Sequence, residues 1–314
     1  MYKSDILNKA IELKNSQAAR HKAAYNARLE KLNNDILRLG EIDTALANLG
    51  AQLMVSAMKG NLEEINLAKE QSEALSNEKK MLLDSAGIKP FAPLCPICED
   101  SGMVSGKICN CVKFIAKELC LNELKEKSPV EQSSFEQFDL SYYPDDSREK
   151  MKKLFDFSFD YANNFNYDST NVLFMGKCGL GKTHLSLAIA KKVLDKGFGV
   201  IYGSAQDLFA DAEKEHFSYS AQSEKRDSLL NCDLLIIDDL GTEFTTSFTQ
   251  SLFYNIVNTR ILNRKPTLIN TNLSFEELDS RYTSRITSRF LGEYTIKLFV
   301  GNDIRQIKAM QKLK

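Results

Sequence analysis

The stretch MGKCGLGKTHLSL, residues 175–187, decides the fold of this chain. It fits the pattern G-x-x-x-x-G-K-[ST], with Gly176, Gly181, Lys182 and Thr183 at the fixed positions, and the apolar run VLFM ends at its first residue. This order predicts a buried strand that leads into a loop and then into a helix. Such a unit is typical of a parallel α/β sheet that binds phosphate.

The spacing of the glycines has a chemical reason. Gly176, Gly179 and Gly181 let backbone N–H groups turn toward phosphate oxygens at the positive end of a helix dipole. Lys182 is expected to reach the β- and γ-phosphates of ATP, and Thr183 to place its hydroxyl on Mg²⁺. The alternative is a glycine-rich turn that binds nothing, which the strand before it and the helix-forming sequence after it disfavour.

Composition and charge describe an ordinary soluble protein. The chain has 314 residues, of which 43% are hydrophobic and 26% charged, and this length allows two domains. The net charge of −1 gives no overall attraction to nucleic acid, so DNA binding must come from local patches. No apolar run is long enough to span a membrane, and the start MYKSDILNKA lacks the apolar core of a signal peptide. We therefore expect a cytoplasmic protein.

Residues 1–90 are expected to form a helical partner-binding region. Apolar residues recur every three or four positions up to about residue 59, which predicts one amphipathic helix. Gly60-Asn61 interrupts this pattern, and a second helical pattern follows until Gly87 and Pro90 end it. A helical hairpin or short coiled coil results. Its helices either pack only on each other or also dock a partner or a second copy.

Four of the seven cysteines crowd into CPICEDSGMVSGKICNC, residues 95–111. A C-x₂-C pair followed by a C-x-C pair is a spacing at which four thiolates can surround Zn²⁺ tetrahedrally. The ligands expected for this structural zinc site, within a module of residues 91–125, are Cys95, Cys98, Cys109 and Cys111. Unrelated buried cysteines or a redox pair are the alternatives. The exchange of Cys120 for one ligand stays open.

The carboxyl-terminal half has the pattern of a parallel sheet. Residues 126–165 are expected to be a linker. From residue 166 to 314, the short apolar runs NVLFM, GVIY, LLIIDD, PTLIN and TIKLF alternate with helical patterns. Strands that alternate with helices predict an α/β domain with helices on both faces of the sheet.

Two further strand ends carry polar side chains suited to nucleotide chemistry. The strand in CDLLIIDDLGTE ends in Asp238, expected to hold Mg²⁺ through water, and Asp239, expected to orient the attacking water. The strand in TLINTNLSFEEL ends near Asn272, our candidate for sensing the γ-phosphate, with Asn270 and Thr271 as alternatives. A polar turn without function is the alternative for either strand end.

The order of these motifs, together with SRITSRF and FVGNDIRQIK, resembles the AAA+ ATPase core of the bacterial replicative helicase loaders of the DnaC/DnaI type, which share an IstB-like ATP-binding core. MKGNLEEI, LLDSAGIKP and CPICEDSGMV are similar to the amino-terminal partner-binding and zinc region of the same loaders. The resemblance covers roughly residues 50–314. It implies that Asn272 is sensor 1, that Arg289 is an arginine finger acting on a neighbouring subunit, with Arg285 one turn before it, and that Arg305 is sensor 2.

The resemblance also implies a function. A loader of this type would hydrolyse ATP slowly with Mg²⁺, assemble through its AAA+ core, and place a DnaB-type helicase on single-stranded DNA during replication initiation or restart, as part of a primosome. The alternatives are an IstB-like transposition helper and a non-catalytic ATP-binding adaptor. Candidate DNA contacts lie in residues 208–226 and 304–314.

Two departures from the family pattern matter. Asp239 stands where AAA+ proteins usually carry Glu, so Glu243 is an alternative residue for activating water. Nine residues follow Arg305, so the helical lid of AAA+ proteins is expected to be minimal or absent.

Overall fold

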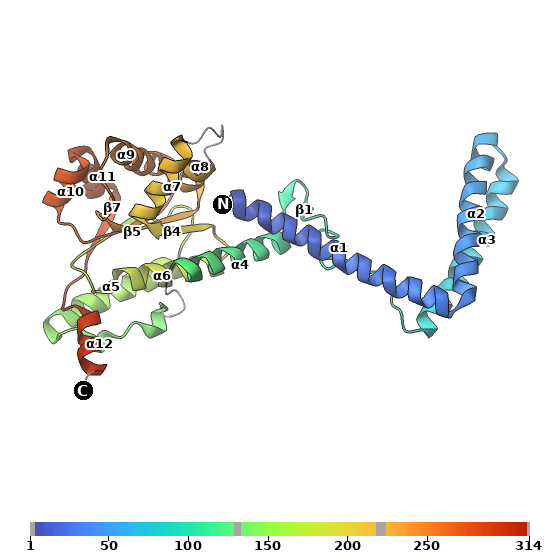
Figure 1. The fold of residues 1–314 in the computed structure, drawn as a ribbon, viewed down its shortest axis with the longest axis horizontal. Helices are drawn as coiled ribbons and strands as arrows, with labels where there is room; N and C mark the ends of the chain where they lie inside the picture. Colours follow the sequence, from blue (N-terminus) through green and yellow to red (C-terminus); the bar gives the residue numbers. More distant parts are fainter. Residues whose placement is uncertain (1–3, 129–132, 218–223, 313–314) are drawn as a thin grey trace. The chain divides into compact units, whose positions relative to one another are not determined.

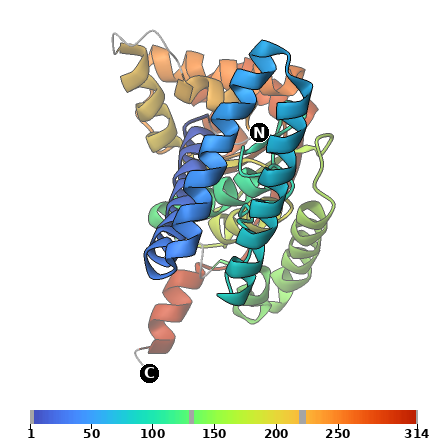
Figure 2. The same cartoon turned by 90° about the vertical axis from the view of Figure 1, so that its right-hand side faces the viewer.

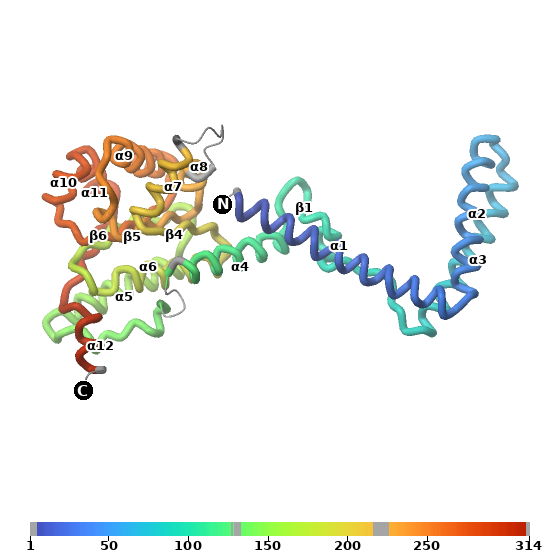
Figure 3. Tube along the Cα trace, in the orientation of Figure 1, coloured from blue at the N-terminus to red at the C-terminus, as the bar shows by residue number. Residues whose placement is uncertain are grey.

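A computed structural model describes residues 4–128, 133–217 and 224–312 of the chain (Figure 3). The chain forms two compact units, one of residues 1–11 and 110–314 and the other of residues 12–109. Parts of both candidate DNA-contact segments, residues 218–223 and 313–314, lie outside the described ranges. Among the described helices, none combines the length and the apolar composition needed to cross a membrane.

The larger unit is built on a parallel sheet, which confirms the predicted α/β class (Figure 1). Within the described residues its strands lie in the order β4-β5-β6-β3-β7. Their bounds are β3 Asn171–Met175, β4 Val200–Ser204, β5 Leu234–Leu240, β6 Thr267–Thr271 and β7 Tyr294–Leu298. Each strand falls on one of the five apolar runs.

Strand β6 lies between the strand that leads into the glycine loop and the strand that ends in two aspartates. It pairs in parallel with β3 on one side and with β5 on the other. Because the carboxyl ends of parallel strands meet at one edge of a sheet, the end of β6 lies between the glycine loop and the acidic strand end. This topology places the polar residues of three distant segments together.

Helices cover both faces of the sheet (Figure 1). Helix α6, Lys182–Asp195, packs on one face and is backed by α5, Asp145–Asn163, and α4, Asn110–Lys127. The other face is covered by α7 Ala205–Phe217, α8 Glu224–Asn231, α9 Ser247–Leu262, α10 Phe275–Tyr282 and α11 Ser284–Glu293. There Ile237 and Ile269 of the sheet share a buried core with Phe253 of α9. Helix α12, Ile304–Lys312, follows β7.

Much of the segment expected to be a linker is folded into the larger unit. It contains the 3₁₀ turns Phe135–Gln137 and Leu140–Tyr142 and then helix α5, which packs on α6. The ring of Phe135 is buried and makes edge-on contacts with Phe155 and Phe159 of α5. These aromatic contacts stabilise the segment internally, and the packing of α5 on α6 holds it against the sheet.

The helices of the smaller unit differ in one respect from expectation. The prediction of one continuous helix up to residue 59 was wrong. Two helices are present, α1, Ser4–Asp35, and α2, Leu37–Lys59. Between them the backbone of Ile36 leaves the helical region (φ −119°, ψ 88°). The residues before the break, NND, favour hydrogen bonds that compete with the helix, which explains the interruption.

Helices α2 and α3, Leu62–Ser85, form the expected hairpin and lie side by side (Figure 2). Gly60 ends α2 in the left-handed conformation at φ 71°. Arg38 of α2 donates two hydrogen bonds, of 2.7 and 3.0 Å, to the carboxylate of Glu78 of α3. Beyond α3, the short strands β1, Met103–Val104, and β2, Lys107–Ile108, pair antiparallel.

Candidate nucleotide-binding site and cysteine cluster

The glycine loop joins β3 to α6, which begins at Lys182. Its three glycines have positive φ angles of 146°, 74° and 89°, a region that residues with a Cβ rarely adopt. A Cβ on Gly176 would lie 2.6 Å from the carbonyl oxygen of Phe299, so a side chain is also excluded by space. The loop therefore presents backbone, not side chains, at the amino-terminal end of α6.

Lys182 connects this loop to the end of β6. Its Nζ donates to the carbonyl oxygens of Gly176 at 2.6 Å and Lys177 at 2.8 Å, and to Oδ1 of Asn272 at 2.6 Å. The side chain is buried, and this burial lowers the pKa of Lys182 from its usual value. The ammonium group is held at the place where the loop would receive the terminal phosphates.

Asp238 is the buried centre of a hydrogen-bond network at the end of β5. Its carboxylate accepts from the Thr183 hydroxyl at 3.3 Å, the Tyr202 hydroxyl at 2.6 Å and the Asn270 amide at 2.6 Å. Asn270 is fully buried, and its Oδ1 accepts from Ser186 of α6. Asn270 therefore supports the network from within the sheet, whereas Asn272 faces Lys182.

Asp239 adopts a left-handed backbone conformation, with φ at 51°, that turns it away from the line of β5. Its side chain is half-buried and lines a cavity of about 460 Å³ together with Lys182, Thr183 and Asn272. Burial, and then the charge of Asp238, raise the pKa of Asp239, while the charges of Lys182 and Arg305 and a hydrogen bond with Asn272 oppose that rise. The carboxylate thus faces the space in which a nucleotide would react.

Glu243 does not line this cavity. Its side chain is 3% exposed, and its carboxylate accepts from the backbone N–H of Gly241 at 2.9 Å and from the Tyr282 hydroxyl. Of the two carboxylates that sequence left open for activating water, Asp239 is therefore the better placed.

One wall of the cavity is made of residues that sequence reasoning did not select. Phe138, Tyr142 and Tyr143 come from the segment before β3, and His184 comes from the first turn of α6. The Tyr143 hydroxyl donates to the carbonyl oxygen of Leu180 at 2.8 Å, and the rings of Phe138 and Tyr143 stack with centroids 5.8 Å apart. The aromatic sequence FDLSYY was the available signal for this wall.

The segment after β7 lies beside this wall, with Nζ of Lys308 at 4.9 Å from the centroid of the Tyr142 ring. Arg305 and Lys308 of α12 line the cavity. The backbone N–H of Ile304 donates to the carbonyl oxygen of Gly179 at 3.0 Å, which ties the start of α12 to the glycine loop. The structure therefore brings Arg305, the predicted sensor 2 residue, to the cavity without a further lid domain in the described residues.

Arg289 lies apart from the cavity, on α11. Its guanidinium donates to Oδ1 of Asn258, with Nε at 3.1 Å, and lies over the ring of Tyr254 with 5.0 Å to the centroid. Arg285, one turn earlier, is exposed. Neither arginine lines the cavity of its own chain, so any action on a nucleotide would be on that of another subunit.

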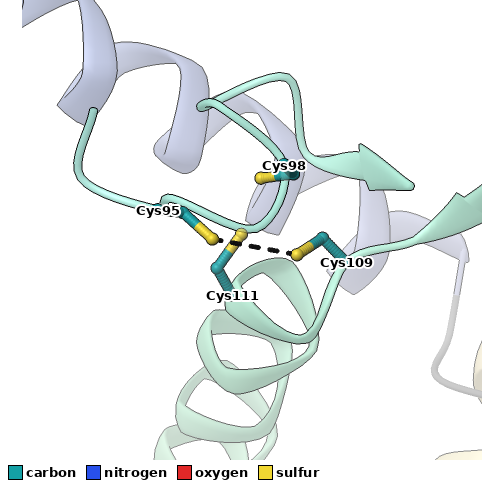
Figure 4. A group of neighbouring side chains, drawn as sticks. All are labelled: Cys95, Cys98, Cys109 and Cys111. Atoms are coloured by element: carbon teal, nitrogen blue, oxygen red, sulfur yellow. Dashed lines mark hydrogen bonds between the residues drawn. The ribbon is translucent and has the colours of Figure 1, made fainter. Parts of the chain in front are cut away.

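The four cysteines between residues 95 and 111 come together in space (Figure 4). All four sulfur atoms lie within 4.8 Å of one another, and the Sγ atoms of Cys95 and Cys109 are 3.9 Å apart. Four thiolates around Zn²⁺, each at about 2.3 Å, would have neighbouring sulfurs about 3.8 Å apart. The donor set and spacing therefore fit zinc. Cys120 is buried but is not part of this group.

The loop that carries the first two cysteines is held by Asp100. Its carboxylate accepts from the backbone N–H groups of Leu94 and Cys95, both at 2.9 Å, and pairs with the buried Lys14 of α1. Phe91, just before the loop, contacts the rings of His21 and Tyr25 of α1. The cysteine cluster is thus packed on α1.

Comparison with known proteins finds a matching family and several relatives with similar names. The family described as IstB-like ATP binding protein matches residues 117–293. The replicative helicase loader DnaC of Escherichia coli (strain K12) is 31% identical over 131 residues, which are 41% of this chain and 53% of that protein. The replicative helicase loader DnaC of Buchnera aphidicola subsp. Baizongia pistaciae (strain Bp) is 28% identical over 158 residues, 50% of this chain and 62% of that protein.

The chain thus spans only about half to three fifths of these curated relatives. Among solved structures, the crystal structure of the DnaC helicase loader superimposes with a TM-score of 0.49 at 22% identity, covering 55% of this chain and 98% of that chain.

Proposed function

The chain belongs to the family of IstB-like ATP-binding proteins, and we propose that it is an ATP-hydrolysing loader that places a DnaB-type replicative helicase on single-stranded DNA. The observation that carries the nucleotide part of this proposal is the meeting of Lys182, Asn272 and Asp239 around one cavity at the mouth of the glycine loop. The loader part rests on the relatives named above.

The loop and its helix bind the phosphates. Backbone N–H groups of residues 176–181 and the start of α6 offer hydrogen bonds to phosphate oxygens, and the Lys182 ammonium neutralises the terminal phosphates. The residues suited to hold Mg²⁺ are Thr183 and Asp238, whose side chains already lie within hydrogen-bond distance of each other at 3.3 Å. Bound there, Mg²⁺ supplies charge neutralisation for the β- and γ-phosphates.

Hydrolysis is assigned to residues around the γ-phosphate position. Asp239 accepts a hydrogen bond from the attacking water and orients it, and its raised pKa is consistent with a carboxylate partly removed from solvent. Asn272 forms hydrogen bonds with both Lys182 and Asp239 and so fixes their relative positions. Arg305 of α12 adds positive charge to the cavity, and Arg289 or Arg285 supplies charge to the cavity of a neighbouring subunit.

The aromatic wall receives the nucleobase. Phe138 offers its partly exposed ring beside the loop and is backed by the buried ring of Tyr143, and the polar edge of a purine has Asp139 and Ser133 as neighbours in the same wall. Stacking of a base on aromatic side chains is favourable for any base, so this wall contributes affinity more than selectivity.

The α2–α3 hairpin is the proposed docking element for the helicase. It exposes large apolar side chains, which are Leu37, Met54, Val55, Met58, Leu62, Leu67 and Met81. Exposed apolar side chains gathered on one hairpin are typical of protein-binding surfaces. The cysteine cluster binds zinc as a structural metal that stiffens the end of the smaller unit, and the larger unit assembles into a homo-oligomer.

Two measurements test the proposal. ATP turnover is measured with and without single-stranded DNA and a DnaB-type helicase, and helicase capture is measured with the purified chain. Met58→Lys on the hairpin should abolish capture, whereas Lys69→Ala, at an exposed position of α3, should not. Turnover without helicase capture would favour an IstB-like transposition helper. ATP binding without turnover under any condition would favour a non-catalytic adaptor.

A further inference from the structure

Glu243 is a buried carboxylate that the proposed reaction does not use. It follows the acidic end of β5 by a few residues, and its carboxylate accepts from the Gly241 backbone at 2.9 Å and from the Tyr282 hydroxyl. Nε of Arg281 lies 3.5 Å from the same carboxylate. Burying a charge is costly unless it is paired and hydrogen-bonded, so this cluster is a built feature and not a chance contact.

The cluster joins the turn after β5 to the end of α10. Arg281 also donates to the backbone carbonyl of Glu243, and the Arg281 carbonyl accepts from the Gln250 side chain of α9 at 2.7 Å. On the cavity side, both the backbone N–H and the hydroxyl of Thr242 donate to the carbonyl of Asp239, at 3.2 and 2.9 Å. These hydrogen bonds, together with the peptide bond between Thr242 and Glu243, therefore connect Asp239 in the cavity to the last residues of α10.

The connection continues into α11 through a strained residue. Thr283, between α10 and α11, has φ at 81°, a conformation that a β-branched residue adopts only when its surroundings impose it. The Thr287 hydroxyl of α11 donates to Asp279 of α10 at 2.7 Å, so the two helices are tied on both sides of this residue. The direction of α11, and of the arginines on it, depends on where α10 ends.

We propose that Glu243 is a positioning residue that couples the Asp239 turn to helix α11, so that the nucleotide cavity of one subunit controls how that subunit presents Arg289 to its neighbour. This inference rests on the proposed function, in which Arg289 acts across subunits. Glu243 is the link because its two carboxylate oxygens hold opposite sides of the contact, the turn through Gly241 and α10 through Tyr282.

Tyr282→Phe is the informative variant, because it removes only the hydroxyl that donates to Glu243 and keeps the ring that packs on Phe253 at 5.0 Å. Its matched control is Tyr161→Phe on α5, which removes a hydroxyl that donates to the carbonyl oxygen of Thr170. We expect Tyr282→Phe to bind ATP with unchanged affinity and KM and to lose about tenfold in kcat in the assembled state. Tyr161→Phe should retain wild-type turnover.

Mixed assemblies separate positioning from a role in the variant's own cavity. On the proposed function, Asp239→Asn should bind ATP without hydrolysing it, and it keeps Arg289. Mixed with Tyr282→Phe, it should raise turnover, because it presents a correctly placed Arg289 to the intact cavity of Tyr282→Phe. Arg289→Ala mixed with Tyr282→Phe should give no increase.

Increased turnover with Arg289→Ala but not with Asp239→Asn would overturn the inference, because it would mean that Glu243 serves the cavity of its own subunit. Wild-type kcat in Tyr282→Phe would overturn it as well. Arg289→Ala mixed with Asp239→Asn is the reference: without restored turnover there, the trans role of Arg289 fails, and this coupling fails with it. Absence of turnover in the wild-type protein would instead refute the proposed hydrolysis itself.

Discussion

Nζ of Lys182 lies 2.6 Å from Oδ1 of Asn272, although the two residues are 90 positions apart in the chain. The contact exists because β6 lies directly beside β3, so that the end of one strand faces the loop after the other. Lys182 thus has both loop carbonyls and a side chain of the neighbouring strand as partners, and a nucleotide that enters the loop competes with oxygen atoms for this ammonium group.

Lys182→Ala should therefore abolish ATP binding. The substitution removes the ammonium at the terminal-phosphate position, and truncating one partner of a buried charged pair weakens binding by about a hundredfold or more. Titration with a fluorescent ATP analogue measures the effect. Lys177→Ala is the matched control, because Lys177 is exposed in the same loop and should be dispensable. Unchanged affinity in Lys182→Ala would refute the assignment of the loop.

The local parts of this site could be predicted from sequence, and the assembled parts could not. The loop glycines, Lys182 and the aspartates of β5 stand in short motifs whose spacing is set by the phosphate and the metal ion. The wall formed by Phe138 and Tyr143 could not be placed, because nothing local indicates that a segment before β3 folds back onto the loop after it.

The choice between Asp239 and Glu243 shows the same limit. Asp239 lies near the end of β5 and Glu243 lies three residues beyond that strand, and only the tertiary contact with Tyr282 reveals that Glu243 is occupied elsewhere. The break at Ile36 was missed for a different reason: the apolar spacing continues through it, so the periodicity alone predicts an unbroken helix.

The purified chain should contain one zinc ion per molecule, held by the cysteine cluster. Elemental analysis measures the zinc content. A chelator should remove the metal and make residues 91–111 susceptible to proteolysis, because metal binding and local folding are coupled. Cys95→Ser combined with Cys109→Ser should lose the metal. Cys178→Ser is the control, since Cys178 is exposed and lies outside the cluster. Full zinc content in the double variant would contradict the site.

ATP should protect Cys178 from alkylation. This thiol is exposed and lines the cavity beside the glycine loop, whereas Cys120 and Cys232 are buried. In the zinc-loaded protein, whose cluster thiolates are held by the metal, we expect one thiol that reacts fast with N-ethylmaleimide and is lost in Cys178→Ser. Its rate should be roughly tenfold lower at an ATP concentration ten times the Kd. Mass spectrometry of the labelled peptide identifies the site. A labelling rate independent of ATP would place the phosphates elsewhere.

Asp239→Asn should stabilise the protein while it abolishes turnover. The pKa of Asp239 is raised in the folded state, so the folded state binds this proton more tightly than the unfolded state and loses stability as the pH rises through the folded pKa. At pH 7 the substitution removes that cost, and Asn also tolerates the positive φ better. We expect Tm to rise by roughly 1–3 °C.

The pH dependence supplies the check on this explanation. The difference in Tm between Asp239→Asn and wild type should narrow on acidification, as the wild-type carboxyl becomes protonated. The exposed Asp156→Asn should leave Tm unchanged at each pH. A lower Tm in Asp239→Asn at pH 7 would mean that the carboxylate contributes more through Lys182 and Arg305 than its burial costs.

Arg289→Ala should bind ATP normally and lose hydrolysis only in the assembled state. Its guanidinium is held by Asn258 and Tyr254 on the face of α11, away from the cavity of its own chain, and an arginine supplied across an interface accelerates phosphoryl transfer by roughly 10³-fold or more. Mixing Arg289→Ala with Lys182→Ala should restore part of the turnover at interfaces that join an intact loop to an intact arginine. Arg285→Ala is the comparison variant, because Arg285 is exposed one turn away. Loss of turnover in Arg285→Ala but not in Arg289→Ala would assign the action on the neighbouring subunit to Arg285. Lost turnover without rescue in the mixture would mean that Arg289 serves its own chain through Asn258 and Tyr254.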